Sequence, residues 1–124
     1  MNWTATGGLL MLLGVAAGAF GAHALKTRLD PAMMDVYHTA VQYHLIHALG
    51  ILLVAVLLRT GAISAGGGSR VAWFLLSGII LFSGSLYAMA LSGVRTLGAI
   101  TPVGGLAFIV GWLLLIFEAM ANRS

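Results

Sequence analysis

Residues 36–58 read VYHTAVQYHLIHALGILLVAVLL and carry no ionised side chain over 23 positions. The hydrocarbon core of a bilayer is about 30 Å thick, and about 20 apolar residues of α-helix cross it. This segment is therefore long enough to span a membrane as one helix. Three further uncharged segments are also long enough: residues 1–25, 71–94 and 96–117, of 25, 24 and 22 residues. The pattern predicts four membrane-spanning helices joined by short connections.

The composition favours the same interpretation. Of the 124 residues, 60% are hydrophobic and 7% are charged, whereas a soluble domain carries roughly 25% charged residues. Nine charged side chains cannot cover a water-soluble protein of this size. The apolar segments also lack the alternation of membrane-spanning strands. The predicted fold class is all-α: a polytopic membrane protein with four transmembrane helices in an antiparallel bundle, and residues 1–124 forming a single membrane domain.

Local signals place the helices at approximately 3–24, 31–58, 71–91 and 102–121. Asp30 followed by Pro31 is typical of an N-cap and a first helical position, and Thr101 followed by Pro102 repeats the pattern. Residues 64–69, SAGGGS, are expected to form a flexible connector. Residues 22–24 resemble a signal-peptide cleavage site, but no Lys or Arg precedes Lys26, which favours an uncleaved first helix.

The charged residues do not determine the orientation of the chain in the membrane, and they do not indicate a soluble binding partner. Three Lys or Arg residues lie on each side of the membrane: Arg59, Arg70 and Arg123 with the termini, and Lys26, Arg28 and Arg95 opposite. The N-terminal amine gives a weak preference for both termini in the cytoplasm. The net charge of +3 comes from scattered residues, which argues against nucleic-acid binding. The expected partners are the lipid bilayer and a second copy or a larger membrane complex.

The 17 glycines need an explanation, because glycine is costly inside a helix. In lipid, helices associate through close packing, which small residues permit. Glycines recur along one face of the first and last predicted helices. We expect six to pack helices together: Gly14, Gly18, Gly21, Gly84, Gly104 and Gly111. Packing within one bundle and self-association between bundles both fit this spacing.

Ionisable side chains at membrane depth are costly and are functional hypotheses by default. His47 lies 12 residues before Arg59, about 18 Å along the helix and close to the bilayer centre. The antiparallel arrangement places most polar residues in the membrane half facing the 26–35 connection. The pattern predicts a polar pocket that opens on this side with His47 at its floor. Its candidate residues are His23, Tyr37, Tyr43, His44, His47, Ser83, Ser85, Tyr87 and Thr101.

Several uses of such a pocket remain open. His44 and His47, three residues apart, have the spacing of a two-histidine metal site, and histidines on two helices bind haem in some bundles. His47, Tyr43 and Tyr87 also suit a quinone or a lipid headgroup. Alternatively, the histidines hydrogen-bond across helices and hold their packing in place. Carboxylate partners are lacking and His47 has no histidine at its own depth, so no metal or cofactor is predicted.

Glu118 lies on the glycine face of the last predicted helix and therefore points toward neighbouring helices. Arg59 and Arg70 lie at the same end of the bundle. We expect Glu118 to form an ion pair with one of these arginines. The alternative is a carboxylate that reaches the membrane interface.

Three motifs in this order resemble the YgdD-like family: GAFGAHAL at 18–25, FSGSLY at 82–87 and TPVGG at 101–105. Phe108, residues 111–112 (GW), Tyr43 and residues 47–49 (HAL) also fit this family. Its members are small bacterial inner-membrane proteins without an established activity. The resemblance implies a four-helix integral protein of the bacterial inner membrane, and it brings no catalytic or binding residues.

Catalytic motifs are absent from the sequence. It has no cysteine, no Ser-His-Asp order, no acidic dyad, no phosphate-binding loop and no metalloprotease motif. We therefore expect a protein that is not an enzyme, a structural, accessory or membrane-modulating helical bundle. The alternative is a binder or permease for a small molecule (lipid, quinone, haem or metal) that uses the His/Tyr-lined half of the membrane domain.

Overall fold

A computed structural model describes residues 1–122 of the chain. The described residues form helices and connections, and four helical segments are long and apolar enough to cross a membrane: Trp3–Leu25, Pro31–Arg59, Ala65–Ser92 and Arg95–Ala121. Their α-helices are α1 (Trp3–Phe20), α2 (Pro31–Arg59), α3 (Ala65–Gly78), α4 (Gly84–Ser92) and α5 (Thr101–Ala121). The predicted all-α, four-span fold class is confirmed. Arg123, which entered the charge count, lies outside the described residues.

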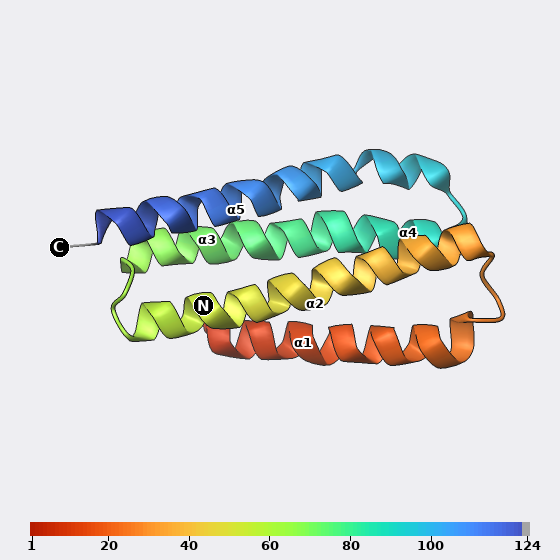
Figure 1. The fold of residues 1–124 in the computed structure, drawn as a ribbon, viewed down its shortest axis with the longest axis horizontal. Coiled ribbons are helices and arrows are strands. Elements are labelled where there is room, and N and C mark those ends of the chain that lie inside the picture. The colour runs from red at the N-terminus through yellow and green to blue at the C-terminus, as the bar shows by residue number, and fades with distance from the viewer. Residues whose placement is uncertain (123–124) are drawn as a thin grey trace.

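Neighbouring segments run antiparallel, and both ends of the chain lie at the same end of the molecule (Figure 1). α1 packs on α2, α2 packs on α3 and α4, and α5 packs on α3. α1 and α5 therefore occupy opposite edges of the bundle (Figure 1). In the most apolar window of the span, 39% of residues are buried for α2 and for α3–α4, against 17% for the spans of α1 and α5. The two edge helices present most of their surface to lipid.

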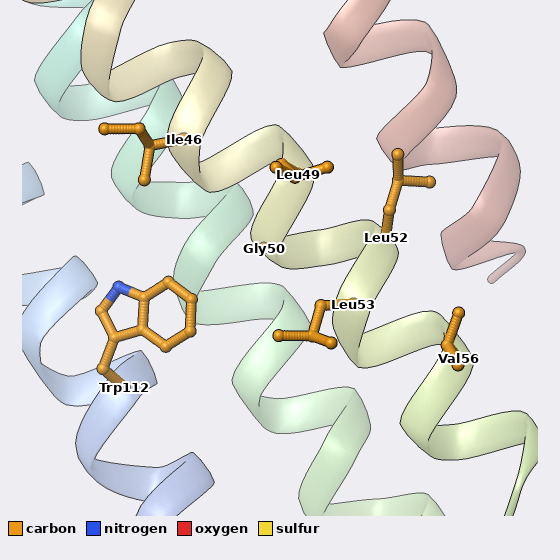
Figure 2. Close-up of a pocket in the computed structure, with 7 residues that line it drawn as sticks. All are labelled: Ile46, Leu49, Gly50, Leu52, Leu53, Val56 and Trp112. Carbon is orange, nitrogen blue, oxygen red and sulfur yellow. The ribbon is translucent and has the colours of Figure 1, made fainter.

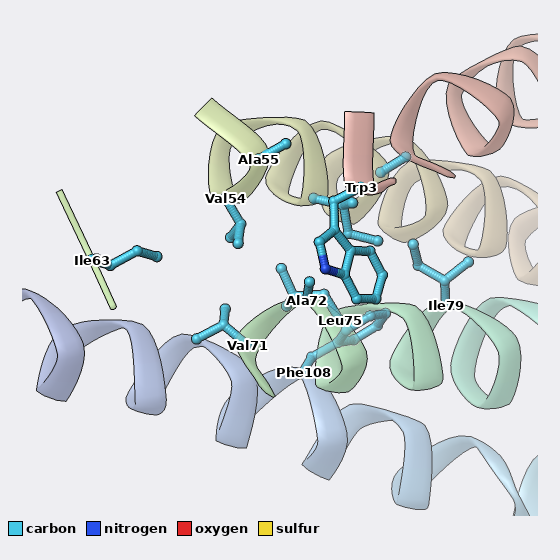
Figure 3. Packing of buried hydrophobic residues seen from close by; sticks show 11 residues of the cluster. Trp3, Val54, Ala55, Ile63, Val71, Ala72, Leu75, Ile79 and Phe108 are labelled. Atoms are coloured by element: carbon cyan, nitrogen blue, oxygen red, sulfur yellow. The ribbon is translucent and has the colours of Figure 1, made fainter. Parts of the chain in front are cut away.

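The apolar core lies toward the end of the bundle that holds the termini. Ile51, Val54, Val71 and Leu75 of α2 and α3 are fully enclosed in it. Trp3 of α1 enters the same cluster (Figure 3), and its ring meets that of Trp73 edge to face, with centroids 5.1 Å apart. The start of α1 is thereby fixed to both central helices.

The prediction of a flexible connector at 64–69 was wrong, because α3 begins at Ala65, six residues before the predicted start of the helix. The Ser64 hydroxyl caps the helix by accepting a hydrogen bond from the Gly67 amide at 3.1 Å. Gly67 and Gly68 are buried, and a Cβ on Gly67 would lie 1.8 Å from the carboxylate carbon of Glu118. These glycines permit close contact rather than flexibility.

Two helix-end predictions had different outcomes. Asp30 caps α2 as predicted, since its carboxylate accepts a hydrogen bond from the Met33 amide at 2.8 Å. Thr101 does not cap α5: Ile100 occupies that position, and no side chain caps the helix. The Thr101 hydroxyl instead lies 2.6 Å from that of Ser85 on α4. Thr101 therefore contacts a neighbouring helix instead of capping its own.

Two π-helical turns interrupt the spans, at Gly21–Leu25 after α1 and at Ile79–Ser83 between α3 and α4. A π-turn adds a residue to the helix and often marks a functional position. The second turn places Ser83 in full burial, where its hydroxyl donates a hydrogen bond to the Ala40 carbonyl of α2 at 2.8 Å. It therefore aligns a polar side chain with the neighbouring span.

Candidate functional site

His44 is the centre of a hydrogen-bonded contact among three spans. Its Nδ1 lies 2.8 Å from the Tyr87 hydroxyl of α4, and its Nε2 lies 2.8 Å from the Leu10 carbonyl of α1. A carbonyl oxygen only accepts, so Nε2 donates and Nδ1 accepts from the Tyr87 hydroxyl. The histidine is buried and both of its ring nitrogens have partners. It thus joins α1, α2 and α4.

Other predicted pocket residues form similar contacts nearby. The Tyr37 hydroxyl donates to the Ala17 carbonyl of α1, and the Tyr37 ring meets the Tyr87 ring with centroids 5.4 Å apart. The Ser85 hydroxyl lies 3.0 Å from the Phe82 carbonyl as well as close to Thr101. Ser83 and Ser85 are buried, and Tyr37 is 2% exposed. These polar atoms are directed at other helices rather than at an open space.

His47 faces a different neighbour from His44. Its Nδ1 lies 2.8 Å from the Tyr43 carbonyl of its own helix, and its ring stacks on Phe108 of α5 with centroids 3.6 Å apart. The Trp112 ring lies 5.8 Å away. The two histidines therefore have different neighbours although they lie about 60° apart around α2: His44 contacts α1 and α4, and His47 contacts α5.

Two predicted pocket residues lie apart from the buried contacts. His23 is exposed in the π-turn that follows α1. Tyr43 is 39% exposed, although its ring packs on Phe82 with centroids 4.5 Å apart. Within residues 1–122, no enclosed polar side-chain atom lacks a hydrogen-bond partner. The structure therefore brings most of the predicted residues together as interhelical contacts.

The three hollows described on the protein surface are lined by other residues. The largest, about 500 Å³, lies on the outer face of α2, with Gly50 and Trp112 among its lining residues (Figure 2). A second, about 330 Å³, lies between α3 and α5 beside Ser77. The third, about 220 Å³, lies beside Asn2 and Arg59. None of them opens among the predicted pocket residues.

Glu118 forms a separate polar contact at the other end of the bundle. Its carboxylate accepts hydrogen bonds from the Ser64 hydroxyl at 2.6 Å and from the Ser64 amide at 3.3 Å. Arg70 lies 3.8 Å from it, with its own side chain 70% exposed. Among the described residues, Arg59 makes no ion pair with Glu118. The carboxylate thus rests on the first turn of α3.

Sequence reasoning missed two partners in this region. It assigned Ser64 to a connector: serine is a preferred N-cap residue, but the three glycines that follow it are poor helix formers and hide the start of the helix. It did not consider Asn122, whose amide donates to the Gly61 and Ala62 carbonyls at 3.3 and 2.9 Å. The Leu10 partner of His44 is a backbone carbonyl. Every residue has such a carbonyl, so the sequence does not show which one accepts the hydrogen bond.

Four of the six predicted packing glycines leave no room for a Cβ. An added Cβ would lie 2.6 Å from Leu45 at Gly14, 2.4 Å from Tyr37 at Gly21 and 2.9 Å from Leu75 at Gly111. At Gly104 it would lie 2.2 Å from the Phe82 amide nitrogen. Gly18 makes an ordinary contact with Val41 at 3.4 Å, and Gly84 has only the Ile79 carbonyl, at 4.0 Å. Other glycines outside these six are also tightly packed: Gly7, Gly50, Gly67, Gly68 and Gly78. Gly7 and Gly78 lie on the small-residue faces that the sequence indicates, whereas Gly50, Gly67 and Gly68 were not predicted to pack.

Within residues 1–122, no three His, Asp or Glu side chains gather as ligands for a metal ion. The four apolar spans and the interhelical polar contacts define a multi-pass integral membrane protein. Residues 17–105 match the family described as "Protein of unknown function (DUF423)", and the chain belongs to this family.

Bacterial relatives of this chain are also named membrane proteins. The UPF0382 membrane protein YwdK of Bacillus subtilis is 43% identical over 114 residues, which cover 92% of each chain. The UPF0382 membrane protein SH2409 of Staphylococcus haemolyticus is 46% identical over 112 residues, which cover 90% of this chain and 89% of the relative. No solved structure matches the chain. The protein is accordingly a multi-pass bacterial membrane protein of a family without an established activity.

Proposed function

We propose that the protein is a structural or accessory component of the membrane, a firmly packed bundle that acts through its lipid-facing helices. One observation carries this proposal: the enclosed polar side-chain atoms of residues 1–122 all have hydrogen-bond partners within the chain. His44, Tyr37 and Ser83 use their polar atoms to hold neighbouring spans. The interior therefore offers few groups for chemistry, which supports a role other than that of an enzyme.

The edge helices are the natural contact surface for a partner. α1 and α5 present large apolar side chains such as Leu9, Leu106 and Ile109, which are 56%, 61% and 65% exposed. Lipid covers such a surface by default, and another membrane protein covers it equally well. We infer a second copy or a larger membrane complex as the partner, without a required metal or cofactor.

The alternative of a small-molecule binder or permease in the His/Tyr-lined half has less support. A ligand there must displace interhelical bonds such as that between His44 and Tyr87, and no described hollow opens among these residues. On the motifs at 18–25, 82–87 and 101–105, we also propose that the YgdD-like proteins are relatives of this chain.

Photo-crosslinking in native membranes tests the proposed role. Benzoylphenylalanine is placed at Leu9 on α1, at Ile109 on α5 and, as a control, at Thr27 in the exposed 26–30 connection. We expect protein adducts from one of the two edge positions and none from Thr27. An adduct of twice the chain mass identifies a second copy, and any other mass identifies a larger complex. Only lipid adducts from both edges would contradict the accessory role.

A further inference from the structure

The largest hollow is an apolar groove on the outer face of α2, and it opens to the lipid. Its volume is about 500 Å³. Leu49, Leu53 and Val56, each about half exposed, line it on α2, and Trp112 of α5 closes one side (Figure 2). Its described lining includes no charged residue. The groove itself therefore suits an apolar chain rather than a polar group.

The groove covers one half of the membrane span. Its lining residues on α2 run from Ile46 to Val56, which is about 15 Å along the helix. The hydrocarbon of one leaflet is half of a core about 30 Å thick, and thus has the same depth. Ile46 lies at the middle of α2, and Val56 lies near its end at Arg59. An acyl chain of a lipid in this leaflet therefore matches the groove in length and direction.

Arg59 lies one helical turn beyond the end of the groove. Leu52, Val56 and Arg59 are spaced by four and three residues, so they share one face of α2, and the first two line the groove. The Arg59 residue is exposed, and it has no ion pair within residues 1–122. A guanidinium binds phosphate oxygens through two parallel hydrogen bonds. Arg59 therefore supplies a cation for the headgroup of a lipid whose chain enters the groove.

A smaller and more polar hollow, of about 220 Å³, is lined by Arg59 and Asn2. The Asn2 side-chain oxygen accepts a hydrogen bond from the Ala5 amide at 3.0 Å, which leaves the NH2 group as a second donor. The described lining includes no Asp or Glu, and Glu118, at the same end of the bundle, already has Arg70 beside it. The ammonium of a zwitterionic headgroup therefore has no acidic partner in this hollow. The donors favour a headgroup with a net negative charge.

We propose that an acidic phospholipid binds here, with its phosphate on Arg59 and Asn2 and one acyl chain in the groove. The chain runs along Val56, Leu53 and Leu49 toward the bilayer centre. Basic residues beside a transmembrane helix attract anionic lipids, and the groove holds the chain of the lipid that they attract. A helix of a second copy would cross both leaflets, whereas the groove covers only one. This lipid site goes beyond the accessory role proposed above and does not depend on it.

Native mass spectrometry of the full chain tests the headgroup. The protein is mixed in detergent with equal amounts of dioleoylphosphatidylglycerol and dioleoylphosphatidylethanolamine, which share chains and phosphate but differ in net charge. We expect one bound lipid, with phosphatidylglycerol preferred. Arg59→Gln should weaken phosphatidylglycerol binding about tenfold, the effect of losing a hydrogen bond to a charged group. Arg70→Gln removes the same charge at the same end of the bundle and should bind as the wild type does.

Groove-filling variants test the chain. Leu53→Trp should also weaken binding, whereas Leu9→Trp, on lipid-facing α1, should not. Both Leu53 and Arg59 are exposed, so their variants are expected to fold. Glycerol 3-phosphate, a headgroup without chains, should not displace the lipid.

Four results would overturn the proposal. The first is equal binding of the two lipids, and the second is equal binding of phosphatidylglycerol to the wild type and to Arg59→Gln. The third is an equal loss in Arg70→Gln, which would indicate general attraction to a basic surface. The fourth is a lipid-free dimer that Leu53→Trp disrupts, which would assign the groove to a second copy.

Discussion

Glu118 illustrates how a charged side chain is held at the edge of the hydrocarbon. Its carboxylate has a hydroxyl and an amide of Ser64 as donors, and Arg70 stands farther away at 3.8 Å. An exposed ion pair contributes about 0–1 kcal/mol, whereas a hydrogen bond to a charged group contributes about 1.5–3 kcal/mol. Ser64, rather than Arg70, is therefore the principal partner of Glu118.

Glu118→Ala should accordingly lower the free energy of unfolding by about 1–3 kcal/mol, because it removes the carboxylate that accepts both hydrogen bonds from Ser64. Arg70→Ala should cost less than about 1 kcal/mol, since its side chain is largely exposed. Denaturant unfolding in one detergent measures both variants. Arg59→Ala, which has no described contact with Glu118, is the control. An Arg70→Ala loss equal to that of Glu118→Ala would show that the ion pair dominates.

At the level of helices, glycines set how closely the spans approach. Gly104 of α5 lies against backbone atoms of the π-turn at Ile79–Ser83, where an added Cβ would meet the Phe82 amide nitrogen at 2.2 Å and its Cα at 2.7 Å. Backbone cannot rotate away as a side chain does, so the spans must separate. Gly8 of α1 is exposed and meets nothing within 4 Å. These two positions form a matched pair.

Gly104→Ala should destabilise the protein by about 1–3 kcal/mol or more, as overpacking does in cores. Gly8→Ala should be neutral or stabilising by up to about 1 kcal/mol, because alanine is the better helix former. Thermal unfolding followed by circular dichroism compares the two variants. Equal effects at both positions would contradict close backbone packing at Gly104.

For the whole molecule, the apolar core and the polar contacts occupy different ends of the bundle. The core cluster around Ile51 and Leu75 lies toward the termini, and the contacts of Tyr37 and His44 lie toward the 26–30 connection. In lipid, apolar burial drives helix association weakly, so packing and interhelical hydrogen bonds supply specificity. The polar residues thus hold the end of the bundle where the core is thinner.

The four spans could be predicted from sequence because uncharged length is a direct consequence of bilayer thickness. The polar residues of the candidate site could also be predicted, because polar side chains at membrane depth are costly and stand out in an apolar segment. Their hydrogen-bond partners could not be predicted. The acceptors of Tyr37, His44 and Ser83 are carbonyls of Ala17, Leu10 and Ala40, which no side-chain pattern marks. The triple glycine at 66–68 was misread because its contact, Glu118, is about fifty residues away in the chain.

A comparison of Tyr87→Phe with Tyr43→Phe tests whether buried polar contacts hold the helices together. The Tyr87 hydroxyl bonds His44 across two spans, whereas the Tyr43 hydroxyl has no partner within residues 1–122. A double-mutant cycle of His44→Ala with Tyr87→Phe, measured by unfolding in one detergent, should give a coupling of about 0.6–1.7 kcal/mol. Tyr43→Phe should leave stability unchanged. A coupling of zero, or an equal loss in Tyr43→Phe, would contradict a polar interior that holds the helices together.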